Sequence, residues 1–247
     1  MNEPGYSDHA EHVRDELARV AELLHAHLAD DLGEPAPDTA SAHRAVARDL
    51  AVRITARVAR TGVPLRLPEL ANRFGLTRPE VDALLLCLLW ELSQDRDDWA
   101  TLTGGRDRRP TIDLVTRVLA ERSDFTATAA LFLPHRPLVG EGLLHTAPPG
   151  EVWVDDRIAR HLAGDDGLPG ELADLVTVVQ PTTRRLVLAP DLRATLDRLA
   201  PWLATQARDV VLLLHGDEGS GRRSVAAALC GAGRRPLLVV DGPAALP

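Results

Sequence analysis

The sequence contains no lysine, and all 28 of its basic residues are arginine. Any chemistry that needs a lysine ammonium is therefore missing or carried by arginine, which is longer, planar and poorly matched to a compact site. Aromatic residues make up only 3% of the chain, which argues against a stacking surface for single-stranded nucleic acid. Strongly biased codon usage produces such a composition, so the missing lysine matters only where lysine would carry chemistry.

Cysteines and long apolar runs are also scarce. Cys87 and Cys230 lie far apart in apolar surroundings, which is typical of buried free thiols and not of a disulfide scaffold. No apolar run approaches the roughly 20 residues of a membrane-spanning helix. The acidic, polar start of the chain lacks the features of a signal peptide. We therefore expect a cytoplasmic protein with no membrane partner.

Acidic residues outnumber basic ones by 36 to 28, which gives a formal net charge of −8. This balance disfavours a general affinity for nucleic acid or anionic lipid. The acidic surplus lies in the first two thirds of the chain, and the last third is close to neutral. Together with the loop-like sequence GDDGLPG at 164–170, this change predicts a domain boundary near residues 170–185.

Residues 1–62 predict a helical hairpin or arm. Apolar residues recur at spacings of three and four from Val13 to Leu28 and again from Val46 to Val58. A stretch rich in glycine and proline at 33–37 separates the two runs. Stripes this short favour packing within the chain over a dimeric coiled coil, which needs three to four sustained heptads.

Residues 63–170 predict a winged helix, an α+β fold. Helices are expected at 67–75 and 79–93, joined by a turn in which Thr77 caps the second helix. That second helix is apolar nearly all round, which indicates burial. Further helices are expected at 111–121 and 123–133. A strand, a turn at 147–150, a second strand and a helix at 157–164 then complete the winged-helix order.

Residues 171–247 predict the start of an α/β module. An extended segment at 184–190 leads into a helix at 191–208. The apolar run at 209–216 indicates a strand buried on both faces of a parallel sheet. A glycine-rich turn, a helix from Arg222 and a second strand at 237–242 follow. The order strand, loop, helix, strand is that of a βαβ unit.

The glycine-rich turn is the strongest chemical signal in the sequence. Glycines let successive backbone N–H groups turn inward around an anion, and the helix that follows adds unsatisfied N–H donors. The spacing fits the phosphate-binding motif G-x-x-x-x-G-K-[ST] up to its second glycine. The candidate nucleotide-binding residues are Gly216, Asp217, Glu218, Gly219, Ser220, Gly221, Arg222, Arg223 and Ser224.

Two positions of the turn depart from that motif. Arg222 stands where the motif has lysine, and Arg223 stands where a serine or threonine would hold magnesium. Ser224 comes one residue late, which on a helix is a rotation of about 100°. We therefore expect no catalytic residue and no magnesium site in this chain alone. A glycine turn that joins strand to helix and binds nothing is the competing interpretation.

The chain resembles bacterial AAA+ ATPases that carry an N-terminal winged-helix domain. The resemblance lies in LPELANRFGLTRPEVDALLLCLLWELS, in RRPTIDLVTRVLAERS and in RRLVLAPDLRATLDRLAPWLATQARDVVLLLHGDEGSGRRSVAAALC. It implies binding of ATP or ADP through a degenerate Walker A loop, and assembly with other protein subunits as a homo-oligomer. It also implies a Walker B strand, an arginine finger and a helical lid, which this sequence does not contain. We therefore expect the front part of a longer protein.

A winged helix also raises the possibility of DNA binding. A recognition helix offers arginine, asparagine or glutamine to base edges, whereas the second helix here offers Glu80, Asp82 and Glu91. The basic cluster at 104–110 is expected to be a solvated loop. We therefore expect no nucleic-acid partner.

Nine histidines raise the possibility of a metal site. His9 and His12 could share a helix face, whereas His25 and His27, two residues apart, point apart. Neither pair has a further ligand at metal-binding spacing, so no metal site is expected.

These patterns favour the N-terminal part of an AAA+ ATPase, in which a degenerate Walker A loop binds nucleotide and the winged helix serves protein–protein contact or regulation. The alternative is a non-enzymatic interaction or adaptor module whose glycine loop binds no nucleotide. Winged-helix DNA binding ranks behind both.

Overall fold

The computed structural model describes residues 4–31, 38–92, 96–105, 108–120, 124–168, 170–173, 175–180, 189–205, 210–217, 219–233 and 235–240. The chain divides into two units, Met1–Asp166 and Gly167–Pro247. Across the described ranges, no helix has both the length and the apolar character that crossing a membrane requires.

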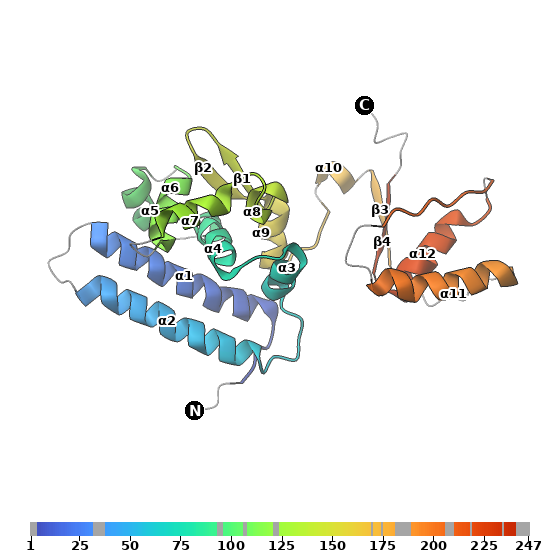
Figure 1. Ribbon diagram of the computed structural model, residues 1–247, viewed down its shortest axis with the longest axis horizontal. Helices are drawn as coiled ribbons and strands as arrows, with labels where there is room; N and C mark the ends of the chain where they lie inside the picture. The colour runs from blue at the N-terminus through green and yellow to red at the C-terminus, as the bar shows by residue number, and fades with distance from the viewer. Residues whose placement is uncertain are drawn as a thin grey trace. The chain divides into compact units, whose positions relative to one another are not determined.

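Two long helices, α1 (His9–Asp31) and α2 (Asp38–Val58), form the N-terminal hairpin. Helix α1 lies between α2 and the other helices of the first unit (Figure 1). Its predicted apolar stripe is buried, with Val20 and Leu24 at 0% and 2% exposure. The hairpin therefore packs within the chain, against the helices that follow it.

The predicted helix-turn-helix is formed by α3 (Arg66–Phe74) and α4 (Arg78–Leu92). Helix α3 ends at Gly75, which has a φ of +62° and donates its N–H to the last turn of the helix, as expected for a left-handed helix end. At the start of α4, the Glu80 carboxylate accepts hydrogen bonds from the backbone N–H and the hydroxyl of Thr77, at 2.8 and 2.7 Å. The Glu80 side chain thus reaches back to the residue before α4, which is one half of a capping box and stabilises the beginning of the helix.

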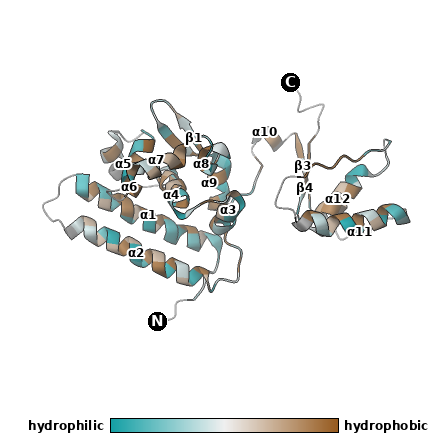
Figure 2. Cartoon of the chain, viewed as in Figure 1, coloured by the Kyte–Doolittle hydropathy of each residue, from teal (hydrophilic) through white to brown (hydrophobic). Residues whose placement is uncertain are grey.

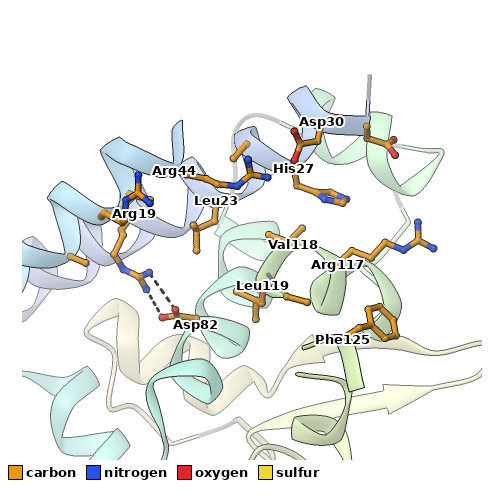
Figure 3. A pocket seen from close by; sticks show the side chains of 16 residues that line it. Arg19, Leu23, His27, Asp30, Arg44, Asp82, Arg117, Val118, Leu119 and Phe125 are labelled. Atoms are coloured by element: carbon orange, nitrogen blue, oxygen red, sulfur yellow. Dashed lines mark hydrogen bonds and ion pairs between the residues drawn. The ribbon is translucent and has the colours of Figure 1, made fainter. Parts of the chain in front are cut away.

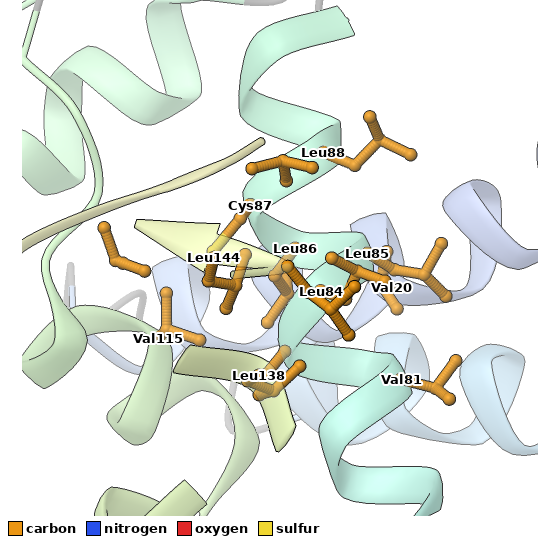
Figure 4. Close-up of a cluster of buried hydrophobic side chains, with 14 of the residues drawn as sticks. Val20, Val81, Leu84, Leu85, Leu86, Cys87, Leu88, Val115, Leu138 and Leu144 are labelled. Carbon is orange, nitrogen blue, oxygen red and sulfur yellow. The ribbon is translucent and has the colours of Figure 1, made fainter. Parts of the chain in front are cut away.

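Helix α4 is the centre of the hydrophobic core. Its residues 83–88 have no exposed surface, and Val20, Val115, Leu138 and Leu144 lie around them (Figure 4). Truncating one such leucine to alanine typically costs about 2–5 kcal/mol. Cys87 belongs to this core as a buried free thiol, whereas Cys230 is free but only partly buried. Burial raises the pKa of the Cys87 thiol, so it is an inert packing residue.

The elements after α4 complete the first unit. They are α5 (Arg96–Thr103), α6 (Ile112–Leu119), α7 (Phe125–Ala129), the 3-10 turn η1 (Ala130–Phe132), α8 (Pro137–Gly140), β1 (Leu144–Ala147), β2 (Glu151–Val154) and α9 (Asp156–Ala163). Strands β1 and β2 pair antiparallel, with Leu144 opposite Val154, and form the hairpin predicted around residues 147–150. Helix α5 was not predicted from the sequence, and the helix expected at 123–133 is divided into α7 and η1. The first strand of the wing was expected to begin near Pro137, but residues 137–140 form α8 and the strand begins at Leu144.

The second unit contains α10 (Gly170–Ala173), β3 (Val176–Val179), α11 (Pro190–Thr205), α12 (Arg222–Ala232) and β4 (Leu237–Val240). The helices expected at 191–208 and from Arg222 correspond to α11 and α12. The strand expected at 237–242 corresponds to β4 in its described part. Most of the extended segment expected at 184–190 lies outside the described residues.

The predicted parallel βαβ unit is not formed by the described residues of the second unit. Residues 210–216 are not in a strand, and Figure 2 colours this segment before α12 as hydrophobic. Val211 and Leu213 in this segment are 95% and 92% exposed. Strand β4 instead pairs antiparallel with β3, so that Val176 lies opposite Val240. The prediction of a strand buried on both faces was wrong because apolar character alone does not supply the neighbouring strands that such burial requires. Over the ranges that the structure describes, the fold is therefore helix-rich, with a winged helix and two small antiparallel sheets.

Candidate functional site

A layer of ion pairs joins α1 to the start of α4. Glu16 is 2% exposed, and its carboxylate accepts hydrogen bonds from Nη1 and Nη2 of Arg78 at 2.7 and 2.6 Å and from Nε of Arg19 at 2.9 Å. Arg19 also donates to Asp82 (Figure 3), and Nε of Arg78 lies 3.1 Å from Asp82. Two carboxylates and two guanidiniums alternate, so that each charge has an opposite partner.

The two carboxylates of this layer differ in their titration. Burial by itself would raise the pKa of Glu16, but the hydrogen bonds and charges of Arg78 and Arg19 hold that pKa below its usual value. Burial raises the pKa of Asp82, and the same two arginines offset it only in part. Glu16 is therefore the carboxylate that the arginines hold most firmly in its charged form.

The acidic side chains of α4 make their contacts within the protein. Glu80 has no exposed surface, and besides Thr77 it accepts a hydrogen bond from Nη2 of Arg136 at 2.8 Å. Asp82 belongs to the layer shared with α1, and burial raises the pKa of the partly buried Glu91. In helix-turn-helix readers of DNA the second helix lies in the major groove. Here that helix is enclosed by α1, α6 and β2.

The outer face of the wing gathers a second group of side chains, Arg109, His145 and Trp153, which we call the wing patch. The guanidinium carbon of Arg109 lies 4.3 Å from the Trp153 ring centroid, a cation–π contact. The His145 ring lies 5.7 Å from the same tryptophan, and its Nε2 is 2.9 Å from a carboxylate oxygen of Asp155. His145 is 45% exposed at its side chain, and Arg109 and Trp153 are partly exposed.

An open pocket of about 970 Å³ lies between the hairpin and α6 (Figure 3). Its charged groups are largely paired: Arg44 with Asp30, and Arg19 with Asp82. Burial lowers the pKa of His27, which lies on its wall. Charges of both signs line the pocket side by side, so it does not select an anion or a cation by net charge.

The glycine turn precedes α12 as the sequence predicts. Gly219 and Gly221 have φ angles of +81° and +84°, and α12 begins at Arg222 without a side-chain cap. The described candidate residues Gly216, Asp217, Gly219, Ser220, Gly221, Arg222, Arg223 and Ser224 thus lie in one turn and the first turn of a helix, and the last three are exposed. Glu218 lies outside the described residues. No paired strand leads into the turn in the described range 210–217.

Sequence reasoning missed both the ion-pair layer and the wing patch. The only sequence signal of the layer is that Glu16 and Arg19 lie on the side of the apolar stripe of α1. Their partners lie more than 60 residues further along the chain. In the wing patch, Arg109 contacts Trp153 of β2. Arg109 belongs to the basic cluster at 104–110, which was expected to be a solvated loop.

Comparison with known proteins yields one family match. Residues 2–176 match the family described as "Winged helix domain, variant". The matched range includes both helices of the hairpin, the helix-turn-helix and the wing, and it ends before the glycine turn. No curated protein and no solved structure matches the chain.

Proposed function

The chain belongs to the variant winged-helix domain family, and from this premise we propose that its winged helix contacts protein and not DNA. The observation that carries this proposal is the enclosure of α4, in which residues 83–88 are fully buried. The polar groups at its start, Arg78 and Asp82, are engaged by Glu16 and Arg19 of α1. Reading DNA with this helix would require breaking that layer, and a buried ion pair costs about 3–5 kcal/mol to break.

The wing patch is the surface that best suits protein contact. Tryptophan and arginine are enriched among the residues that carry most binding energy in protein interfaces. Trp153 and Arg109 are already held against each other, so little side-chain freedom is lost on binding. The partners that we propose are other protein subunits, including further copies of this chain.

Sedimentation equilibrium over a range of concentrations tests this surface. We expect reversible self-association that Trp153→Ala weakens by about 30-fold or more, the effect of removing a strong interface residue. Arg157→Ala is the matched control, since this arginine is 69% exposed and lies beside the same strand pair. A chain that stays monomeric throughout, or a Trp153→Ala variant that associates like the wild type, would contradict the proposal.

We further propose, from the resemblance to AAA+ ATPases, that the chain is the regulatory front part of such a protein and binds ATP or ADP phosphate at residues 216–224. The left-handed Gly219 and Gly221 and the uncapped start of α12 support this, because they leave backbone N–H groups for an anion. Arg222 would add positive charge. Arg223 carries no oxygen for magnesium, so hydrolysis by this chain alone is not expected.

Thermal denaturation with ATP, ADP or neither tests the nucleotide proposal. A ligand at 100 times its dissociation constant stabilises the folded state by about 2.7 kcal/mol, so a retained site raises the Tm of the second unit. If neither nucleotide raises the Tm at millimolar concentration, the glycine turn is empty and the adaptor alternative stands. The double variant Arg222→Lys with Arg223→Thr then shows whether these two positions or the rest of the module limits binding.

A further inference from the structure

Two histidines and one glutamate meet between the helices of the N-terminal hairpin. Glu22 and His25 lie three residues apart on α1 and so share a helix face, and His43 comes from α2. Nδ1 of His43 is 2.6 Å from Oε2 of Glu22, and the His25 and His43 ring centroids are 5.4 Å apart. One ligand atom from each residue lies within 4.8 Å of the other two.

The cluster has the chemistry and the exposure of an accessible metal site. Imidazole nitrogen and carboxylate oxygen are ligands of zinc and its neighbours in the periodic table. The side chains of Glu22 and His43 are 25% and 33% exposed, so water can reach the cluster and complete the coordination of an ion. The histidine rings come from two helices, so an ion held there would also join α1 to α2.

We propose that Glu22, His25 and His43 bind one divalent transition-metal ion of the zinc, cobalt and nickel class. Metal–ligand bonds of about 2.0–2.2 Å place ligand atoms about 3.0–3.6 Å from one another. Glu22 and His43, whose nearest atoms are 2.6 Å apart, therefore separate by about 0.4–1.0 Å on binding, and His25 moves closer through side-chain rotation.

This arrangement could not be recognised from spacing along the sequence. His25 and His27 are neighbours in the sequence, but His27 lines the pocket while His25 turns to α2. The third ligand, His43, lies on the other helix of the hairpin. An ordinary ion pair between Glu22 and His43 is the competing interpretation, and it requires nothing from His25.

Isothermal titration of the chelator-treated chain with zinc tests the site, and cobalt absorption reports the ligand set. We expect one equivalent of zinc to bind and cobalt to give the visible absorption of a nitrogen- and oxygen-ligated ion. His25→Gln and His43→Gln should each weaken zinc binding by at least about 10-fold. Zinc should also raise the Tm of the first unit, and a chelator should reverse the shift.

His27→Gln is the matched control, because it removes a neighbouring histidine of the same helix that lies outside the cluster. It should bind zinc like the wild type. Circular dichroism and the metal-free Tm establish that each variant is folded. Absence of zinc binding in the wild type, or unchanged affinity in the folded His25→Gln variant, overturns the proposal and leaves the ion pair.

Discussion

At the scale of single residues, Glu16 is the side chain that joins the N-terminal hairpin to the winged helix. It is the common acceptor for Arg19 of its own helix and Arg78 of α4. Because the carboxylate is 2% exposed, water cannot replace it. If its charge were removed, Asp82 would be the one carboxylate of the layer left to compensate both arginines.

Glu16→Gln should therefore lower the free energy of unfolding by about 3 kcal/mol, the low end of the range for breaking a buried pair, because Arg78 is half exposed. Urea denaturation measures this. Asp113→Asn is the control, since its partner Arg117 and Asp113 itself are more than half exposed, and its loss should cost less than about 1 kcal/mol. If both variants lost the same small amount of free energy of unfolding, the layer would not be what holds the hairpin to the winged helix.

His12 makes the stability of the first unit depend on pH. It is 2% exposed, its ring lies 4.9 Å from that of Tyr6, and burial lowers its pKa despite the nearby Glu16 carboxylate. As the pH falls below about 6.5, the ordinary pKa of histidine, the unfolded chain therefore takes up a proton that the folded chain does not. Stability contributed by the neutral ring is present above this pH and is lost as the pH falls below it.

The free energy of unfolding should thus decrease below about pH 6.5, by up to about 1.4 kcal/mol per pH unit for each such histidine. His27, whose pKa is also lowered by burial, contributes in the same direction. Urea denaturation at several pH values gives the slope of the free energy of unfolding against pH. This slope should be shallower in His12→Gln and unchanged in His135→Gln, which replaces an exposed histidine. A His12→Gln slope equal to that of the wild type would contradict this account.

At the scale of the elements, a substitution at the end of α3 tests whether local backbone conformation determines where this helix of the helix-turn-helix ends. Gly75 has a φ of +62°, and a Cβ added there would meet no atom within 4 Å. Gly75→Ala should therefore cost about 1–2 kcal/mol through backbone conformation alone. At Gly62 a Cβ also meets nothing, and the backbone is not left-handed.

Gly62→Ala is accordingly the matched control and should leave the free energy of unfolding unchanged or slightly raised, because alanine restricts the unfolded chain. Urea denaturation of the two variants measures the difference. Equal effects at the two glycines would mean that the left-handed turn does not determine where α3 ends.

The elements also show what the sequence could predict. The helix-turn-helix, the capping role of Thr77 and the wing were predictable because turn residues and helical periodicity are local signals. Helix α4 was recognisable as buried because it is apolar all round. The pairing of β3 with β4 could not be predicted, because pairing depends on which strand edges meet in space. In addition, β3 has only four residues, so its sequence pattern is a weak indication of a strand.

The candidate site was less predictable than the fold. The glycine turn before α12 was predictable because its signal is local in sequence, and phosphate binding there stays a prediction. The ion-pair layer, the wing patch and the Glu22, His25 and His43 cluster each join residues from different elements. Such contacts follow from packing, and one sequence does not reveal them.

At the scale of the whole molecule, charge and burial favour the same conclusion. The net charge of −8 opposes general attraction to DNA. The helix that would read DNA is the centre of the hydrophobic core, and the hairpin that covers it lies within the matched family range. Hairpin and winged helix therefore form one folded unit, and the wing is the contact surface that we propose for it.

Fluorescence anisotropy of a labelled DNA duplex of about 20 base pairs, titrated with the chain at low salt where phosphate contacts are strongest, tests this central claim most directly. With α4 enclosed by α1, we predict no saturable rise in anisotropy, and the same result for a variant in which Arg108 and Arg109 are neutralised. Saturable binding that weakens steeply with salt and is lost in that variant would contradict the account and restore DNA as the partner of the winged helix.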